Sequence, residues 1–167
     1  MRRGQKGFSL IELLIVVAII LIIAAIAIPN LMSSRMAANE ASAAGSLRTV
    51  NTAEITYSTM YGTGFAPLVN LGGASPCAAA PATACLIDDV LTTGNKSGYT
   101  VATSAPAALG TVALPNMTYE VSAQPIAQGQ SGQRTFCSDQ SGVIRANIAG
   151  GAPPASCAGA AAFVPIQ

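Results

Sequence analysis

The chain has 167 residues, of which 51% are hydrophobic and only 9% are charged, with a formal net charge of +1. This length allows one domain of usual size beside an apolar segment. Three basic residues lie within the first six positions, and without them five basic side chains face seven acidic ones. Because no cationic face remains, we predict no specific nucleic-acid partner.

The first 28 residues carry the most information. A short basic leader precedes the sequence KGFSLIE, and an apolar run then continues to Ile28. An ordinary secretory signal has its cleavage site after the apolar stretch, whereas here the candidate site, between Gly7 and Phe8, lies before it. Cleavage there would remove residues 1–7 and leave the apolar segment on the mature chain.

The segment from Phe8 to Ile28 has the length of a membrane-spanning helix. Its 21 residues, at about 1.5 Å per residue, match the ~30 Å hydrocarbon core of a bilayer. Arg2, Arg3 and Lys6 flank it on the N-terminal side. Since positive flanks stay in the cytoplasm, we expect the C-terminal part of the chain to lie outside.

A single acid, Glu12, interrupts the apolar segment. A carboxylate inside a membrane helix is costly, so it usually has a functional partner. Cleavage before Phe8 would create an α-amino cation that can pair with Glu12 of the same chain or of a neighbour. In an assembly packed through these helices, the pair selects subunits inserted at the correct stagger. The alternative is an interfacial acid that snorkels or protonates.

Helical character is expected to continue well beyond the membrane. Apolar residues recur at intervals of three or four and form one stripe, which consists of Leu47, Val50, Ala53, Tyr57 and Met60. Pro29 removes a backbone donor and crowds the carbonyl of Ala25, so a kink or local melting is expected there. Helix breakers then follow at Gly62, Gly64 and Pro67.

The remainder of the chain predicts a connecting loop and an antiparallel meander. The loop contains a candidate short helix at Leu86–Leu91. Four stretches rich in β-formers follow, at Tyr99–Thr103, Thr118–Ala123, Arg134–Cys137 and Val143–Ile148. A tight turn at Asp139–Gly142 joins the last two as a hairpin. The tail after Ala149 has no periodicity and would be mobile unless Cys157 holds it.

Four cysteines form an even set in the part of the chain expected outside the cytoplasm, where disulfides persist. Three pairings are open, and we favour Cys77 with Cys85 and Cys137 with Cys157 because each pair is nearest in sequence. The alternative is free buried thiols. A zinc site is disfavoured because the chain has no histidine and no CxxC spacing.

Enzymatic motifs are missing from the sequence. It has no histidine, no GxSxG elbow, no P-loop and no GxGxxG, so we expect no enzyme, no catalytic residues and no cofactor. Asp88 and Asp89 suggest calcium, but neighbours on a helix diverge and a solvated helix face is the favoured interpretation. Tyr57 and Tyr61 are spaced for stacking in electron transport, with core packing of Tyr57 the favoured alternative.

The stretch KGFSLIELLIVVAIILIIAAIAIPNL, from Lys6 to Leu31, resembles the prepilin motif of type IV pilins and their pseudopilin relatives. The resemblance implies that Gly7 precedes the prepilin peptidase cut and that Phe8 becomes the N-methylated first residue. It also implies that Glu12 guides assembly and that Pro29 is the family's helix-interrupting proline. Cys137 and Cys157 are similar to the cysteines that bound the C-terminal region of many pilins, whereas Cys77 and Cys85 are an additional pair.

The same resemblance implies an α+β fold, with a long N-terminal helix and a roughly four-stranded antiparallel sheet. The segments expected on this basis are a leader (1–7), a transmembrane and filament-core helix (8–30), an amphipathic half-helix (31–61), a connecting loop (62–98), a sheet (99–148) and a disulfide-bounded tail (149–167).

The function implied is that of a structural subunit. It would be stored in the inner membrane, processed by a prepilin peptidase and methyltransferase, and polymerised with identical copies on an inner-membrane assembly platform into a surface filament for adhesion or motility. The first alternative is a pseudopilin of a type II secretion system. The others are a single-pass anchor that never polymerises and, last, a membrane enzyme.

Overall fold

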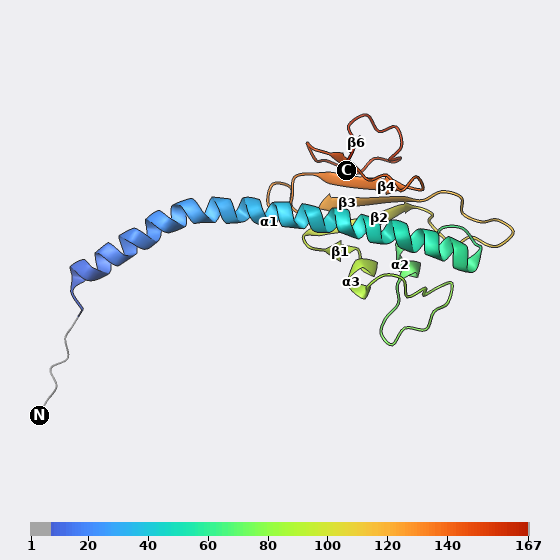
Figure 1. The fold of residues 1–167 in the computed structure, drawn as a ribbon, viewed down its shortest axis with the longest axis horizontal. Coiled ribbons are helices and arrows are strands. Elements are labelled where there is room, and N and C mark those ends of the chain that lie inside the picture. The colour runs from blue at the N-terminus through green and yellow to red at the C-terminus, as the bar shows by residue number, and fades with distance from the viewer. Residues whose placement is uncertain (1–7, 167) are drawn as a thin grey trace, which may run out of the picture. The chain divides into compact units, whose positions relative to one another are not determined.

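The structure is a computed structural model that describes residues 8–166. These residues divide into two compact units, with the boundary between Arg35 and Met36. Helix α1 (Leu10–Tyr61) contributes its first part to one unit and its second part to the other. Figure 1 shows α1 followed along the chain by short helices and the strands of a sheet.

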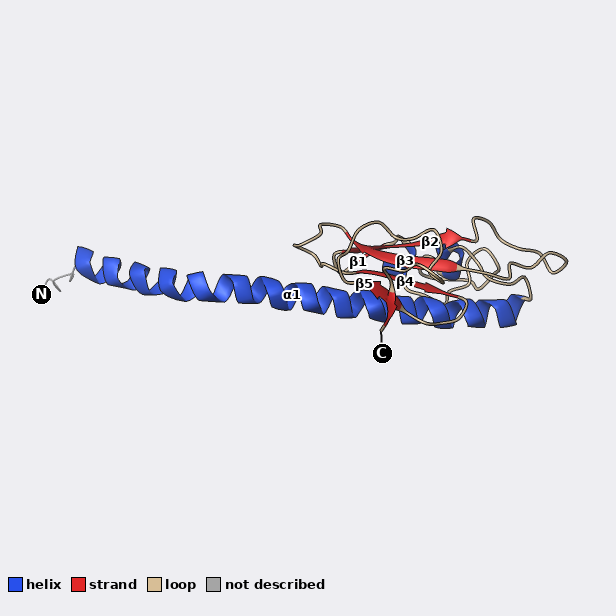
Figure 2. Cartoon of the chain, turned by 90° about the horizontal axis from the view of Figure 1, so that it is seen from above, coloured by secondary structure: helices blue, strands red, loops and turns tan. Residues whose placement is uncertain are grey.

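The second unit combines the end of α1 with two one-turn helices and a six-stranded sheet. The short helices are α2 (Leu68–Leu71) and α3 (Asp89–Thr92). The strands are β1 (Asn95–Lys96), β2 (Tyr99–Ala105), β3 (Glu120–Pro125), β4 (Thr135–Asp139), β5 (Arg145–Asn147) and β6 (Val164–Pro165). Their spatial order follows the chain, and every neighbouring pair is antiparallel. Figure 2 shows strands of this sheet beside the second part of α1. The predicted α+β fold is therefore confirmed.

The sheet has six strands where the sequence predicted roughly four. Strands β2 to β5 lie at the predicted stretches, with ends shifted by one or two residues. The outermost strands β1 and β6 were not predicted, because two residues are too few to show an alternating pattern. Helix α3 begins at Asp89, three residues after the predicted start at Leu86. Helix α2 was not predicted.

The core of the second unit lies between α1 and the sheet. Leu47, Val50 and Tyr57 of α1 have no exposed surface, and they belong to one cluster with Tyr99, Tyr119 and Phe136 of the sheet region. The predicted stripe is thus confirmed at these positions and at Ala53, but Met60 is 58% exposed. Met60 lies in the last turn of α1, beyond Tyr57, which is the last buried residue of this helix.

Polar residues in this core were missed by the sequence reasoning. Asn51 lies on the buried face of α1, where its side-chain amide donates to the Ser138 hydroxyl at 2.9 Å. Its side-chain oxygen accepts from the Tyr119 hydroxyl, also at 2.9 Å. Because both ends of the amide are bonded, Asn51 links the helix to β4 and to the residue that precedes β3, without leaving a buried polar atom unpaired.

Glu54 and Asp139 are the buried acids described in the second unit, and of the two only Glu54 lacks an ion pair. Glu54 has no exposed surface, and one carboxylate oxygen accepts from the Ala66 N–H at 2.9 Å. The other oxygen has no hydrogen-bond partner among the described residues. Burial raises the pKa of Glu54 from 4.5 to about 7, while the Ala66 N–H acts in the opposite direction.

Glu54 therefore predicts a pH-dependent stability. Between pH 4.5 and about 7 the folded chain binds this proton more tightly than the unfolded chain does, so stability falls as the pH rises. The total loss reaches about 3 kcal/mol above pH 7. In Glu54→Gln this loss should vanish. The free energy of unfolding is measured by denaturant titration of the full chain in detergent at pH 5 and pH 8, followed by tyrosine circular dichroism. An equal change with pH in the parent and in Glu54→Gln would contradict the prediction.

Helix α1 passes through Pro29 without a break. The local melting expected at this position is absent, because one proline removes a single bond of the helical ladder and the turns on both sides keep theirs. The Ser33 hydroxyl donates to the carbonyl of Pro29 at 3.2 Å, within the same stretch of helix. The predicted melting is therefore not seen in this structure, and the predicted kink at Pro29 stays a prediction.

Candidate functional site: the first helix and its acidic residue

The first part of α1 is apolar on all sides. The large hydrophobic residues from Phe8, which precedes the helix, to Met32 are between 46% and 80% exposed, so no described part of the chain covers them. An 18-residue window of this helix has a mean hydropathy of 3.3, and the helix is long enough to cross a membrane. A helix that is hydrophobic all round needs a lipid or protein environment on every face.

Glu12 lies in the first turn of this helix. Its carboxylate accepts a hydrogen bond from the backbone N–H of Ser9 at 3.0 Å. The Ser9 carbonyl in turn accepts from the N–H of Leu13 at 3.2 Å. An acid that reaches back to the N–H three residues earlier forms half of a capping box, and a negative charge is favoured at this end of a helix. The spacing Ser9-x-x-Glu12 is the signal that would have predicted the cap.

This geometry places the Glu12 carboxylate beside the expected cleavage point. Gly7 lies outside the described residues, whereas Phe8 is described and is 78% exposed. The N–H that Glu12 accepts belongs to Ser9, the residue directly after Phe8. The acid is therefore one residue away from the nitrogen that would become the new α-amino terminus.

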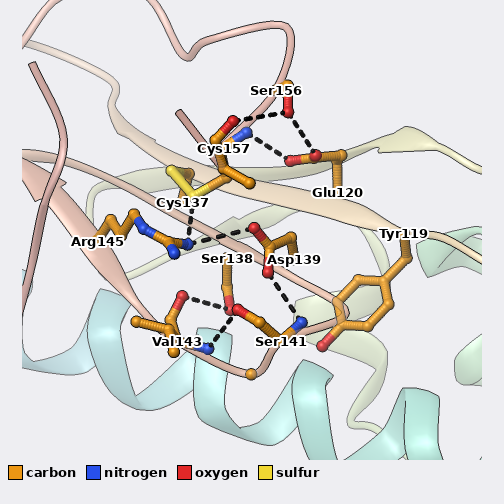
Figure 3. Close-up of polar contacts among 12 residues, drawn as sticks. Tyr119, Glu120, Cys137, Ser138, Asp139, Ser141, Val143, Arg145, Ser156 and Cys157 are labelled. Atoms are coloured by element: carbon orange, nitrogen blue, oxygen red, sulfur yellow. Dashed lines mark hydrogen bonds and ion pairs between the residues drawn. A yellow bond between two sulfur atoms is a disulfide. The ribbon is translucent and has the colours of Figure 1, made fainter. Parts of the chain in front are cut away.

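The C-terminal region is held to the sheet by a disulfide and a carboxylate (Figure 3). Cys137 of β4 and Cys157 form a buried disulfide with their Cα atoms 5.8 Å apart. The Glu120 carboxylate accepts from the Cys157 N–H at 2.8 Å and from the Ser156 hydroxyl at 3.1 Å. Strand β6 then pairs with β5, and the tail is held through Cys157, which is the condition predicted from the sequence for an anchored tail.

The second cysteine pair lies in the loop before the sheet. Cys77 and Cys85 form a disulfide with a Cα–Cα distance of 6.1 Å, and both residues are exposed. The same loop covers Tyr57, whose hydroxyl donates to the carbonyl of Pro81 at 2.8 Å. Tyr57 also packs against Tyr61 with ring centroids 4.7 Å apart, so its place in the core accounts for this pair.

The paired acids Asp88 and Asp89 do not converge on one site. Asp88 caps α3 by accepting from the Leu91 N–H at 2.7 Å, and it forms an ion pair with Lys96 at 2.6 Å. The hydrogen bond from Lys96 lowers the pKa of Asp88. Asp89 is exposed, and no group of three potential metal ligands occurs in the described part of the chain.

Comparison with known proteins gives the class of this site. A family model described as the prokaryotic N-terminal methylation motif matches residues 2–28, which include the capping acid and the apolar helix. The type IV wide pilus major component PilA4 of Thermus thermophilus is 63% identical over 38 residues. The motif and this relative support a type IV pilin family for the chain.

The similarity is confined to a short part of both proteins. The aligned residues are 23% of this chain and 29% of the relative. No solved structure matches the chain.

The disulfide at the sheet predicts a local and a global effect. Replacing Cys137 and Cys157 together by serine should lower the free energy of unfolding by about 3 kcal/mol, because a 20-residue loop is no longer closed in the unfolded chain. It should also expose the tail after Ala149 to proteases. The control is the Cys77→Ser/Cys85→Ser pair, which should leave that tail resistant. Equal tail proteolysis in both variants would be inconsistent with the proposed anchoring.

Proposed function

We propose that this chain is the precursor of a filament subunit. In this proposal a prepilin peptidase cuts between Gly7 and Phe8, Phe8 is methylated, and the mature chain polymerises through its first helix on an assembly platform in the inner membrane. The observation that carries the proposal is a helix apolar on all sides, with one acid in its first turn next to the cut.

The proposed mechanism is a change of environment for one helix. Before assembly the lipid bilayer surrounds the apolar residues of α1, and after assembly identical helices surround them, so apolar area stays away from water in both states. New hydrophobic burial therefore does not drive assembly in this mechanism. Selection of the correct stagger falls to Glu12, the charged group within this segment, which needs a cationic partner once it is enclosed.

The Glu12 contact with Ser9 gives this mechanism a defined starting point. In the precursor the carboxylate is satisfied by a backbone N–H and caps the helix. Cleavage then converts the Phe8 nitrogen from an amide into an ammonium group one residue away. Exchange of a neutral donor for a charged one strengthens the bond to a carboxylate, so processing changes the partner of Glu12 at the step that precedes assembly.

A pair of Glu12 variants separates charge pairing from helix capping. Glu12→Gln keeps an oxygen that can accept from Ser9 but loses the charge, whereas Glu12→Ala loses both. If charge pairing directs assembly, both variants should yield at least about tenfold fewer sheared filaments than the parent. Glu40→Gln, on the same helix, is the control and should assemble. Normal filament yield from Glu12→Gln would show that only the cap matters.

Electron microscopy and mass spectrometry of the same preparations test the remaining parts of the proposal. The mature chain should begin at methylated Phe8, and the filaments should extend from the cell surface. Short periplasmic fibres formed only with a secretion machinery would instead indicate the pseudopilin of a type II secretion system. A purified chain that keeps Met1 would refute the processing step.

Pro29 gives a mechanical prediction. The helix is continuous there in the single chain, but the ladder lacks one bond, so we expect this turn to open first when helices pack or are pulled. Pro29→Ala filaments should extend less at a given load in an optical trap. An unchanged force–extension curve would count against a role for Pro29.

A further inference from the structure

Charged side chains are few in the second unit, and nearly all of them have a defined partner. Of the ten between Met36 and Ile166, six form the ion pairs Asp88–Lys96, Glu40–Arg134 and Asp139–Arg145. Glu54 accepts from Ala66, and Glu120 accepts from Ser156 and Cys157. Two charges remain, Arg48 and Asp89. Both are exposed, and neither side chain has an ion pair or hydrogen bond within residues 8–166.

Arg48 lies at the rim of a surface groove. The groove has a volume of about 570 Å³ and runs between α1 and the turn from β4 to β5. Its apolar lining includes Ile55, Val143, Ile144 and Ile166, and Ile55 is 60% exposed. The surface is thus an apolar hollow with one cation, and we call it the Arg48 groove.

Asp89 lies on a surface of matching character. It is the first residue of α3, where the next residue, Val90, is 56% exposed. Val69 of the neighbouring helix α2 is 62% exposed. We call the surface formed by these three residues the Asp89 ridge; it combines one anion that has no ion pair within residues 8–166 with two exposed valines.

The groove and the ridge lie at opposite edges of the sheet. Helix α3 contacts β1, the first strand in the spatial order. The groove is lined by Ile166, which directly follows β6, the last strand, and whose N–H donates to the carbonyl of Ile144. In Figure 1 α3 and β6 accordingly appear on different sides of α1. Two complementary patches so placed cannot meet within one chain, but they can meet between neighbouring copies.

We propose that the Asp89 ridge of one copy docks on the Arg48 groove of the next, with an ion pair between Arg48 and Asp89 of neighbouring subunits. This inference rests on the proposed polymerisation and names a surface for it. A contact between two different patches is heterologous, and repetition of such a contact generates a helical array when it does not close. The opposite charges give the contact a direction, because ridge-to-ridge and groove-to-groove approaches bring like charges together.

The small size of the two patches favours a copy of this chain as the occupant over a free partner. A stable interface between free proteins buries roughly 800 Å² on each partner, far more than two valines and a carboxylate provide. Such a contact becomes effective when its partners are already held close together, since tethering raises the effective concentration. Packing of the α1 helices would supply that tether, whereas an unrelated soluble partner has none.

Charge reversal in the full-length chain tests the pairing. Arg48→Glu and Asp89→Arg should each reduce the yield of sheared filaments by about tenfold, because each brings like charges together at every subunit contact. The double variant restores opposite charges and should recover the parental yield. Gln130→Glu, which adds an exposed negative charge on the loop between β3 and β4, is the control and should assemble normally.

Cross-linking provides an independent readout. Arg48→Lys keeps the charge and supplies an amine, so a zero-length carbodiimide reagent should join it to Asp89 of a neighbour and give a ladder of covalent oligomers. The ladder should disappear in Arg48→Lys/Asp89→Asn. Membrane levels of each monomer, measured by immunoblotting, control for folding.

The outcomes separate this inference from the function on which it rests. Parental cells without filaments would overturn the proposed function itself. Parental filaments together with a double variant as poor as the single ones, or with no effect of either reversal, would overturn the groove-and-ridge contact alone. Cross-linking of the Arg48→Lys variant to a different protein through the substituted position, identified by mass spectrometry of the joined peptides, would show that another partner occupies the groove.

Discussion

The constraint on which the structure depends is the apolar surface of the first part of α1, which must be kept from water on every side. The chain itself offers no cover for it within the described residues. Lipid and a bundle of like helices both satisfy this requirement. A chain with such a segment is therefore compatible with either environment.

The second part of the same helix meets a different requirement, because it is amphipathic and its apolar face is covered by the sheet. Leu47, Val50 and Tyr57 fill the layer beneath the strands, and Asn51 crosses that layer with a fully bonded amide. Bonded polar groups in a core fix the register of the packed elements, because a shifted register would leave them unpaired. Asn51 thus fixes the position of the helix along the strands.

The sequence was sufficient for features that depend on periodicity or on local order. The apolar helix, the stripe on its second part and the alternation of Tyr119, Val121 and Ala123 in the sheet follow directly from side-chain spacing. Features that depend on residues far away in the sequence could not be predicted from it. The two-residue strands β1 and β6 exist only through pairing with β2 and β5, and burial of Glu54 depends on the loop that supplies the Ala66 N–H.

The shortness of the outer strands has a consequence for crowding. A sheet edge with free backbone groups is a template for uncontrolled strand addition, and the risk grows with local concentration. Here each edge offers only two residues, and Pro165 further reduces the donors of β6. Copies of the second unit could therefore lie side by side at high concentration without fusing into a continuous cross-β aggregate.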